Sequence, residues 1–128
     1  MHALCMNKTI SWFEIPAIDL NRAATFYERI LALTLTRGEM GSTSLAVFPY
    51  DRQHATGGTL IYGSGLLPSA DGAVVYLNAG ESLDAVLARI KQAGGAILLP
   101  RTELPAGMGA FAHFADTEGN RVGLHAYA

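Results

Sequence analysis

The chain has 128 residues, of which 50% are hydrophobic and 16% are charged, and its formal net charge is −2. This balance excludes an intrinsically disordered protein and fits one compact domain. Lys and Arg form no cluster, so we expect neither nucleic acid nor a membrane as a partner. No apolar run approaches the ~20 residues that a membrane-spanning helix needs. Cys5 is the one cysteine and cannot form an internal disulfide, which makes the cytoplasm the expected compartment.

The first half of the chain shows one strand-like run, one helical stripe and three more strand-like runs. Residues 1–7 are expected to form a flexible N-terminal segment, and the first run covers residues 9–16. Residues 20–32 carry apolar side chains at helical spacing, which predicts an amphipathic helix with Asp19 as its N-cap. The stripe consists of Leu20, Ala23, Ala24, Tyr27, Ile30 and Leu31. The later strand-like runs cover residues 33–39, 44–50 and 58–62.

The second half repeats this order after a Gly- and Ser-rich linker over residues 63–72. A strand-like run over residues 73–78 precedes a second predicted helix over residues 83–93, with Ser82 as its N-cap. Its apolar residues each lie 63 positions after a counterpart in the first helix, namely Leu83, Val86, Leu87, Ile90 and Ala93. Three further strand-like runs cover residues 96–102, 109–115 and 121–127.

The repeated order is a strand, a helix and three strands, which predicts an α+β protein built from two βαβββ modules. A single module could not cover both faces of its sheet, so we expect the two to pack as one domain over residues 8–127. Module 1 covers about residues 8–63 and module 2 about residues 73–127. The alternative is an unrelated α+β domain with two helices that are similar by chance.

Several short motifs occur in the order and spacing of a known family. The first half contains Ile10-Ser-Trp-Phe-Glu-Ile-Pro16, Asp19-Leu20 and Phe26-Tyr27, and the second half contains Val75-Tyr-Leu-Asn78, Ala93-Gly-Gly95, Leu99-Pro100 and Asp116-Thr-Glu-Gly-Asn-Arg-Val-Gly-Leu-His125. The chain therefore resembles the vicinal oxygen chelate superfamily of glyoxalase I, bleomycin-resistance proteins and extradiol dioxygenases. The resemblance implies one eight-stranded, cup-shaped mixed sheet with the helices outside, and a homodimer. It also implies that Ala32 stands where family members carry glycine.

Enzymes of this family hold a divalent metal with His, Gln or Glu from the first and last strand of each module. The residue at the first of these positions is Trp12, and the residue at the last is Gly123. Residues 57–63 and 74–77 contain no usual metal ligand. The chain therefore resembles a metal-free branch, and we predict no cofactor and no metal site. A metal would have to bind to Glu14 and His125, with His113 as a further ligand.

The period of two along a strand puts Trp12 and Glu14 on one face, and Gly123 and His125 on another. We expect both faces to line one cavity in which Gly123 leaves room for a ligand near Trp12. The candidate ligand-binding residues are Trp12, Glu14, Tyr62, Tyr76, His113, Gly123 and His125. Glu14 and His125 are the candidate acid and base, although they could instead pair with each other, or with a backbone amide, and only stabilise the fold.

Two functions fit this site. The first is metal-independent binding of a small, partly aromatic organic molecule, in the manner of bleomycin-resistance proteins. The second is a lyase or isomerase that uses Glu14 and His125 as acid and base or as partial metal ligands. A third possibility is a structural remnant that serves dimerisation. The sequence does not identify the ligand or substrate.

Overall fold

The two predicted helices are present in a computed structural model, which describes residues 9–128. Helix α2 spans Leu20–Leu31, and the Asp19 carboxylate caps it by accepting a hydrogen bond from the Arg22 amide over 3.1 Å. The helix ends at Ala32, whose φ of 54° and ψ of 50° are left-handed. A side chain with a Cβ atom is strained in this conformation, so Ala32 occupies a position that favours glycine.

Helix α3 spans Leu83–Ala93 and has the same kind of ends. The Ser82 hydroxyl accepts a hydrogen bond from the Ala85 amide over 3.2 Å, and Gly94 ends the helix with a φ of 100°. Both helices bury the apolar side of their stripe, as the spacing predicts. The buried residues are Ala23, Ala24, Phe26, Tyr27 and Ile30 in α2, and Leu83, Val86 and Ile90 in α3.

Each module contributes one four-stranded mixed sheet. The N-terminal sheet has the spatial order β1 (Trp12–Pro16), β4 (Gly57–Tyr62), β3 (Thr43–Val47) and β2 (Thr36–Met40). The C-terminal sheet has the corresponding order β5 (Tyr76–Asn78), β8 (Arg121–Ala126), β7 (Ala110–Ala115) and β6 (Ala96–Glu103). In each sheet the first two strands are parallel and the other neighbours are antiparallel. The α+β fold with two βαβββ modules is therefore confirmed.

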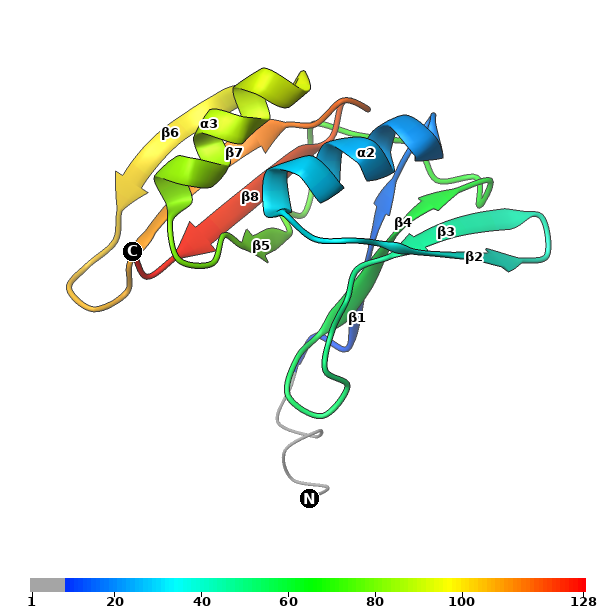
Figure 1. The fold of residues 1–128 in the computed structure, drawn as a ribbon, viewed down its shortest axis with the longest axis horizontal. Helices are drawn as coiled ribbons and strands as arrows, with labels where there is room; N and C mark the ends of the chain where they lie inside the picture. Colours follow the sequence, from blue (N-terminus) through cyan, green and yellow to red (C-terminus); the bar gives the residue numbers. More distant parts are fainter. Residues whose placement is uncertain (1–8) are drawn as a thin grey trace.

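The cup consists of two sheets, whereas the resemblance implied one continuous eight-stranded sheet. Within residues 9–128, β1 and β5 are edge strands of separate sheets and do not pair with each other. Trp12 of β1 and Tyr76 of β5 line the space between these edges. Figure 1 shows the two sheets diverging below the helices.

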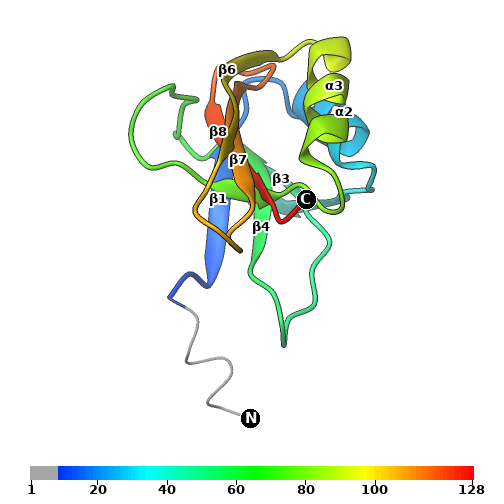
Figure 2. The ribbon, with the colours of Figure 1, turned by 90° about the vertical axis from the view of Figure 1, so that its left-hand side faces the viewer.

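Both helices lie on the same side of the sheets, and Figure 2 shows them together on one side of the molecule. Tyr27 of α2 is fully buried and contacts both halves of the chain. Its ring centroid is 5.8 Å from that of Phe48 and 6.2 Å from that of Phe114 in β7. Burial of a large aromatic residue contributes roughly 1.5–3 kcal/mol, so this contact holds the two modules together.

The turn before β8 is tied to the start of α2. The Glu118 carboxylate accepts hydrogen bonds from the amides of Ile18 and Asp19, over 2.9 and 2.8 Å. The Asn120 side chain donates to the Pro16 carbonyl over 2.8 Å. These contacts explain why polar residues occur in a buried turn, and they fix β8 relative to β1.

In the part of the chain that the structure describes, no helix is long and apolar enough to cross a membrane. The flexible segment expected over residues 1–7, including Cys5, lies outside the described residues.

Candidate functional site

The face of the C-terminal sheet opposite α3 carries polar and aromatic side chains. Alternation along β8 puts Val122, Leu124 and Ala126 on the helix side, where they are buried. The residues between them, and their partners on β5 and β7, face the other way. We call this set the open face; it consists of Tyr76, Asn78, Phe111, His113, Arg121, Gly123 and His125.

A hollow of about 520 Å³ lies on the open face, and we call it the aromatic hollow. Its lining residues are Tyr76, Leu77, Asn78, Leu104, Phe111, His125 and Tyr127. Three of these side chains are Tyr or Phe, and the polar groups among them are few. Aromatic walls with a small number of polar groups are typical of sites that bind small organic molecules.

The ring of Tyr76 lies directly on Gly123. The two residues are partners across β5 and β8, and a Cβ atom at Gly123 would be 2.4 Å from Cδ1 of Tyr76. Only glycine allows this contact. The sequence predicted that Gly123 leaves room for a ligand near Trp12, but a tyrosine ring of the same chain fills that room. The Tyr76 ring therefore packs on the backbone of Gly123.

His113 lies between Tyr76 and Arg121 on the open face. Its Nε2 atom is 2.6 Å from the Tyr76 hydroxyl, and its Nδ1 atom is 2.9 Å from a terminal nitrogen of Arg121. Partial burial and the charge of Arg121, in that order, lower the pKa of His113 below its usual value of 6.5. Both effects favour the neutral imidazole.

His125 takes a backbone partner. Its Nε2 atom is 2.7 Å from the Met108 carbonyl, and because a carbonyl only accepts, Nε2 donates. The Tyr127 ring meets the imidazole edge to face with centroids 4.8 Å apart. The sequence left open whether His125 pairs with Glu14 or with the backbone. In the structure its partner is the backbone carbonyl of Met108, which lies between Gly107 and Gly109 in the loop before β7.

The N-terminal sheet has a similar aromatic-on-glycine arrangement. Trp12 and Gly57 are partners across β1 and β4, as Tyr76 and Gly123 are in the other sheet. A Cβ atom at Gly57 would be 2.6 Å from the ring of Tyr50, which meets Trp12 edge to face at 5.8 Å. Trp12 lines a hollow of about 730 Å³ that lies between β1 and β5.

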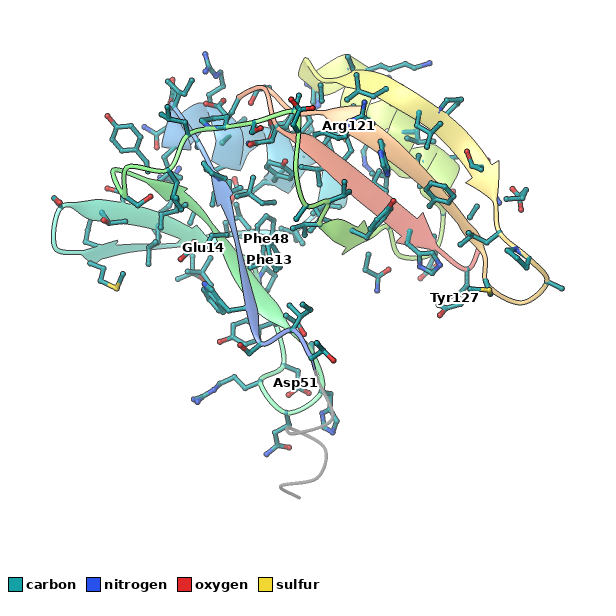
Figure 3. All side chains as sticks on the ribbon, turned by 180° about the vertical axis from the view of Figure 1, so that it is seen from behind. Phe13, Glu14, Phe48, Asp51, Arg121 and Tyr127 are labelled. Atoms are coloured by element: carbon teal, nitrogen blue, oxygen red, sulfur yellow. The ribbon has the colours of Figure 1, made fainter. Side chains whose placement is uncertain are left out.

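Glu14 and Tyr62 lie away from the aromatic hollow. Glu14 shares the face of Trp12, but it lines a smaller hollow of about 150 Å³ together with Arg121. Figure 3 shows Glu14 on β1 and Arg121 on the other sheet. Tyr62 is on the helix side of β4 and lines a polar hollow with Arg37.

The structure thus brings together only part of the predicted site. Tyr76, His113, Gly123 and His125 share the open face. Trp12, Glu14 and Tyr62 line three other hollows, and Tyr76 also lines the one that contains Trp12.

Within residues 9–128, no group of three His, Cys, Asp or Glu side chains is arranged to hold a divalent metal. At the expected ligand positions of both sheets, Gly57 and Gly123 lie beneath the rings of Tyr50 and Tyr76. Divalent metals in proteins are held mainly by His, Cys, Asp and Glu, so indole, glycine and a neutral tyrosine are poor ligands. We therefore assign no metal-dependent step to this site.

Sequence reasoning missed two contributors to the open face. Arg121, the first residue of the predicted strand over residues 121–127, was not among the candidate residues, yet it contacts His113. The signal was available, because Arg121 precedes Gly123 by two residues and so shares its face. Asn78 was also missed, although it lies two residues after Tyr76 on β5 and lines the aromatic hollow.

Comparison with known sequences gives one family. A model of the Glyoxalase/Bleomycin resistance protein/Dioxygenase superfamily matches residues 9–124. The comparison with curated proteins gives no match.

Solved structures of low sequence identity share the fold. TnmS3, an antibiotic binding protein from Streptomyces sp. CB03234, is 22% identical with a TM-score of 0.71, and the match covers 94% of this chain and 97% of that chain. FosX, a fosfomycin resistance protein from Listeria monocytogenes, is 19% identical with a TM-score of 0.64, covering 93% of each chain. Glyoxalase I from Zea mays is 24% identical with a TM-score of 0.65, covering 91% of this chain. The present chain spans 45% of the maize chain, about half its length.

Proposed function

Because the chain belongs to the glyoxalase/bleomycin resistance protein/dioxygenase superfamily, we propose that it binds a small organic molecule in the aromatic hollow without a catalytic metal. The observation that carries this proposal is the hollow of about 520 Å³ walled by Tyr76, Phe111 and Tyr127. A volume of this size suits a molecule of one to a few rings. The single cysteine keeps the cytoplasm as the expected compartment.

One structural neighbour supports binding as the class of function, and a second is a resistance protein against a small organic molecule. TnmS3 is described as an antibiotic binding protein, and FosX as a fosfomycin resistance protein. Both are single chains of about the same length as this one, since the matches cover 97% and 93% of them. Their identities are too low to transfer a ligand, so the present proposal takes from them only the class, an organic small molecule.

The alternative is a lyase or isomerase that uses Glu14 and His125. Such a mechanism needs both side chains within reach of one molecule. In a single chain they line different hollows, and His125 already donates to the Met108 carbonyl. We therefore prefer binding over catalysis by this pair. The third possibility, a structural remnant that serves dimerisation, predicts no ligand at all.

We also propose a homodimer. Trp12 is 39% exposed and lies on the face of β1 opposite the buried Ile15. A second copy would cover it, and twofold dimers are the commonest assembly. Light scattering should give a mass of about twice 13.6 kDa. A monomer mass at every concentration would contradict the dimer.

The binding proposal is tested by metal analysis together with a thermal-shift screen of organic molecules. We expect no metal at unit stoichiometry, a rise in melting temperature with a subset of aromatic compounds, and no change when EDTA is added. Tyr76→Ala should remove the ligand-induced rise. Tyr62→Ala is the matched control, because Tyr62 is exposed to a similar extent, 49% against 47%, and lies on the helix side.

The same screen separates the alternatives. Trp12→Ala should also reduce the rise if the ligand extends into the hollow between β1 and β5. Turnover that disappears in His125→Ala while binding persists would favour the enzyme. A metal bound at unit stoichiometry and required for binding would overturn the metal-free proposal.

A further inference from the structure

The hydrogen bonds around His113 determine which of its nitrogen atoms carries the proton. A guanidinium group only donates, so Arg121 donates to Nδ1 over 2.9 Å, and Nδ1 is the unprotonated nitrogen. A neutral imidazole has one N–H group, which is then at Nε2. This N–H donates to the Tyr76 oxygen over 2.6 Å. In this contact the tyrosine oxygen is therefore the acceptor.

The hydroxyl proton of Tyr76 is consequently free to make another hydrogen bond. Within residues 9–128, the contact with His113 is the one hydrogen bond that Tyr76 Oη makes. The side chain is 47% exposed and lines the aromatic hollow. An oxygen that accepts a hydrogen bond polarises its own O–H bond, so Tyr76 is a stronger donor than an isolated tyrosine.

The position of this donor is fixed before any ligand arrives. The Tyr76 ring rests on the backbone of Gly123, and its centroid is 6.0 Å from that of Phe111 and 5.3 Å from that of His113. A donor that is already held in place loses little conformational freedom on binding. The hydroxyl can therefore discriminate between ligands that do and do not offer an acceptor.

The positive charge of Arg121, which contacts His113, favours an acidic acceptor for the Tyr76 hydroxyl. Among the described residues, the ion pairs within 4.0 Å involve Arg22, His54 and Arg101, and Arg121 takes part in none of them. No carboxylate of the described residues therefore lies within 4.0 Å of its charged group, although Glu14 and Asp71 line the same small hollow as Arg121. Hydrogen bonds to ionised acceptors are about twice as strong as neutral ones, so the gain is greatest for an anionic oxygen.

We propose that Tyr76 donates a hydrogen bond to an acidic oxygen of an aromatic molecule in the aromatic hollow. The hydrogen bonds from Arg121 to His113 and from His113 to Tyr76, which we call the relay, hold the Tyr76 hydroxyl in place. The acceptor is a carboxylate or phenolate oxygen. Tyr76 is the contacting residue, and His113 and Arg121 are positioning residues. This inference rests on the proposed function and specifies the chemical class of its ligand.

The test uses matched pairs of probes in which a methyl group replaces the carboxylate on the same aromatic ring system. The pairs are benzoate and toluene, 1-naphthoate and 1-methylnaphthalene, and 9-anthracenecarboxylate and 9-methylanthracene, titrated against the whole chain by calorimetry. In the pair that fits the hollow, we expect the carboxylate to bind at least about tenfold more tightly. Tyr76→Phe, which removes only the hydroxyl, should weaken carboxylate binding about tenfold and leave the methyl compound unchanged. Tyr62→Phe is the control and should change neither.

The relay is tested by two variants of Arg121 and by nitrogen NMR of the imidazole. The wild-type chain should show the His113 proton on Nε2. Arg121→Lys keeps a donor and should keep both this tautomer and the carboxylate preference. Arg121→Met removes the donor and should give a mixture of tautomers with a weaker preference. If Arg121 had only a structural role, the His113 proton would stay on Nε2 in Arg121→Met.

The outcomes separate this inference from the proposed function. Equal weakening of both members of a pair by Tyr76→Phe, or a wild-type proton on Nδ1, overturns the inference while binding itself stands. If the wild-type chain bound the methyl compound more tightly than the carboxylate, the inference would also be overturned while binding itself stands. Failure of every probe to bind the wild-type chain counts against both the inference and the proposed function.

Discussion

Arg22, in the first turn of α2, donates two hydrogen bonds to the carboxylate of Glu118, which lies 96 residues further along the chain. The shorter one joins Nε of Arg22 to Oε2 of Glu118 over 2.8 Å. The Glu118 side chain is fully buried, whereas that of Arg22 is half exposed. The contact ties the first helix to the turn before the last strand, so it links the two modules by charge as Tyr27 links them by packing.

The stabilisation that Glu118 provides should disappear in acid. Burial alone would raise the pKa of Glu118, but hydrogen bonds from Arg22, Asp19 and Thr117 lower it to about 2, from 4.5. Because the folded pKa lies below the unfolded one, the contribution is complete above about pH 4.5 and is lost as the pH falls through about 2. At pH 7, Glu118→Gln should lower the free energy of unfolding by about 3 kcal/mol in urea titrations. At pH 3 the difference should fall to about half.

Glu103→Gln is the matched control for this measurement. Glu103 also pairs with an arginine, Arg101, over 2.6 Å, but its side chain is 70% exposed. Exposed pairs contribute little, so this variant should unfold at the same urea concentration as the wild type. A Glu118→Gln variant that behaves like Glu103→Gln would show that the buried contact does not stabilise the fold.

The end of α2 predicts a stabilising substitution. Ala32 has a φ of 54°, a conformation in which a Cβ atom crowds the backbone, so Ala32→Gly should raise the free energy of unfolding by about 1 kcal/mol. Ala88→Gly, at an exposed interior position of α3, should instead lower it by about 1 kcal/mol. The two variants make the same chemical change, and denaturant titration should give effects of opposite sign. Destabilisation by both would mean that Ala32 carries no strain.

The sequence was sufficient to predict both helices, but it predicted the strand boundaries less accurately. Asp19 and Ser82 cap the helices as predicted, because capping depends on neighbouring residues alone. The strand predicted over residues 33–39 starts later, at Thr36. The Leu33 amide donates to the Glu28 carbonyl and the Leu35 amide to the Glu28 carboxylate, so neither is free for the sheet.

The candidate site was predictable within a strand but not between strands. Alternation correctly placed Trp12 with Glu14, and Gly123 with His125, on common faces. The pairing of Tyr76 with Gly123 depends on a register between distant segments, which no local pattern encodes. The same applies to the separation of the two sheets, which puts Trp12 and His125 in different hollows.

The contact between Tyr76 and Gly123 predicts a selective loss of binding. In Gly123→Ala the new Cβ atom would lie 2.4 Å from Cδ1 of Tyr76, so the ring must leave its place and the hydroxyl with it. We expect ligand-induced stabilisation to disappear in thermal-shift measurements, with a smaller loss of stability because Tyr76 is half exposed. Gly38→Ala is the control, since nothing lies within 4 Å of a Cβ atom at this strand position. Retained binding in Gly123→Ala would show that the position of the Tyr76 ring is unimportant.

The contact between Arg121 and His113 predicts a histidine that resists protonation. Partial burial and the Arg121 charge hold the pKa of His113 below 6.5, and Arg121→Met removes the second cause, so the pKa should rise toward 6.5. Because the folded pKa lies below the unfolded one, the stability linked to neutral His113 is present above about pH 6.5 and is lost as the pH falls through the folded value. Proton NMR titration of the imidazole in both chains measures the change. Arg52→Met, in the loop before β4, removes the same charge from a site that does not contact His113 and should leave its titration unchanged. An identical His113 titration in Arg121→Met and the wild type would mean that Arg121 does not act on the imidazole.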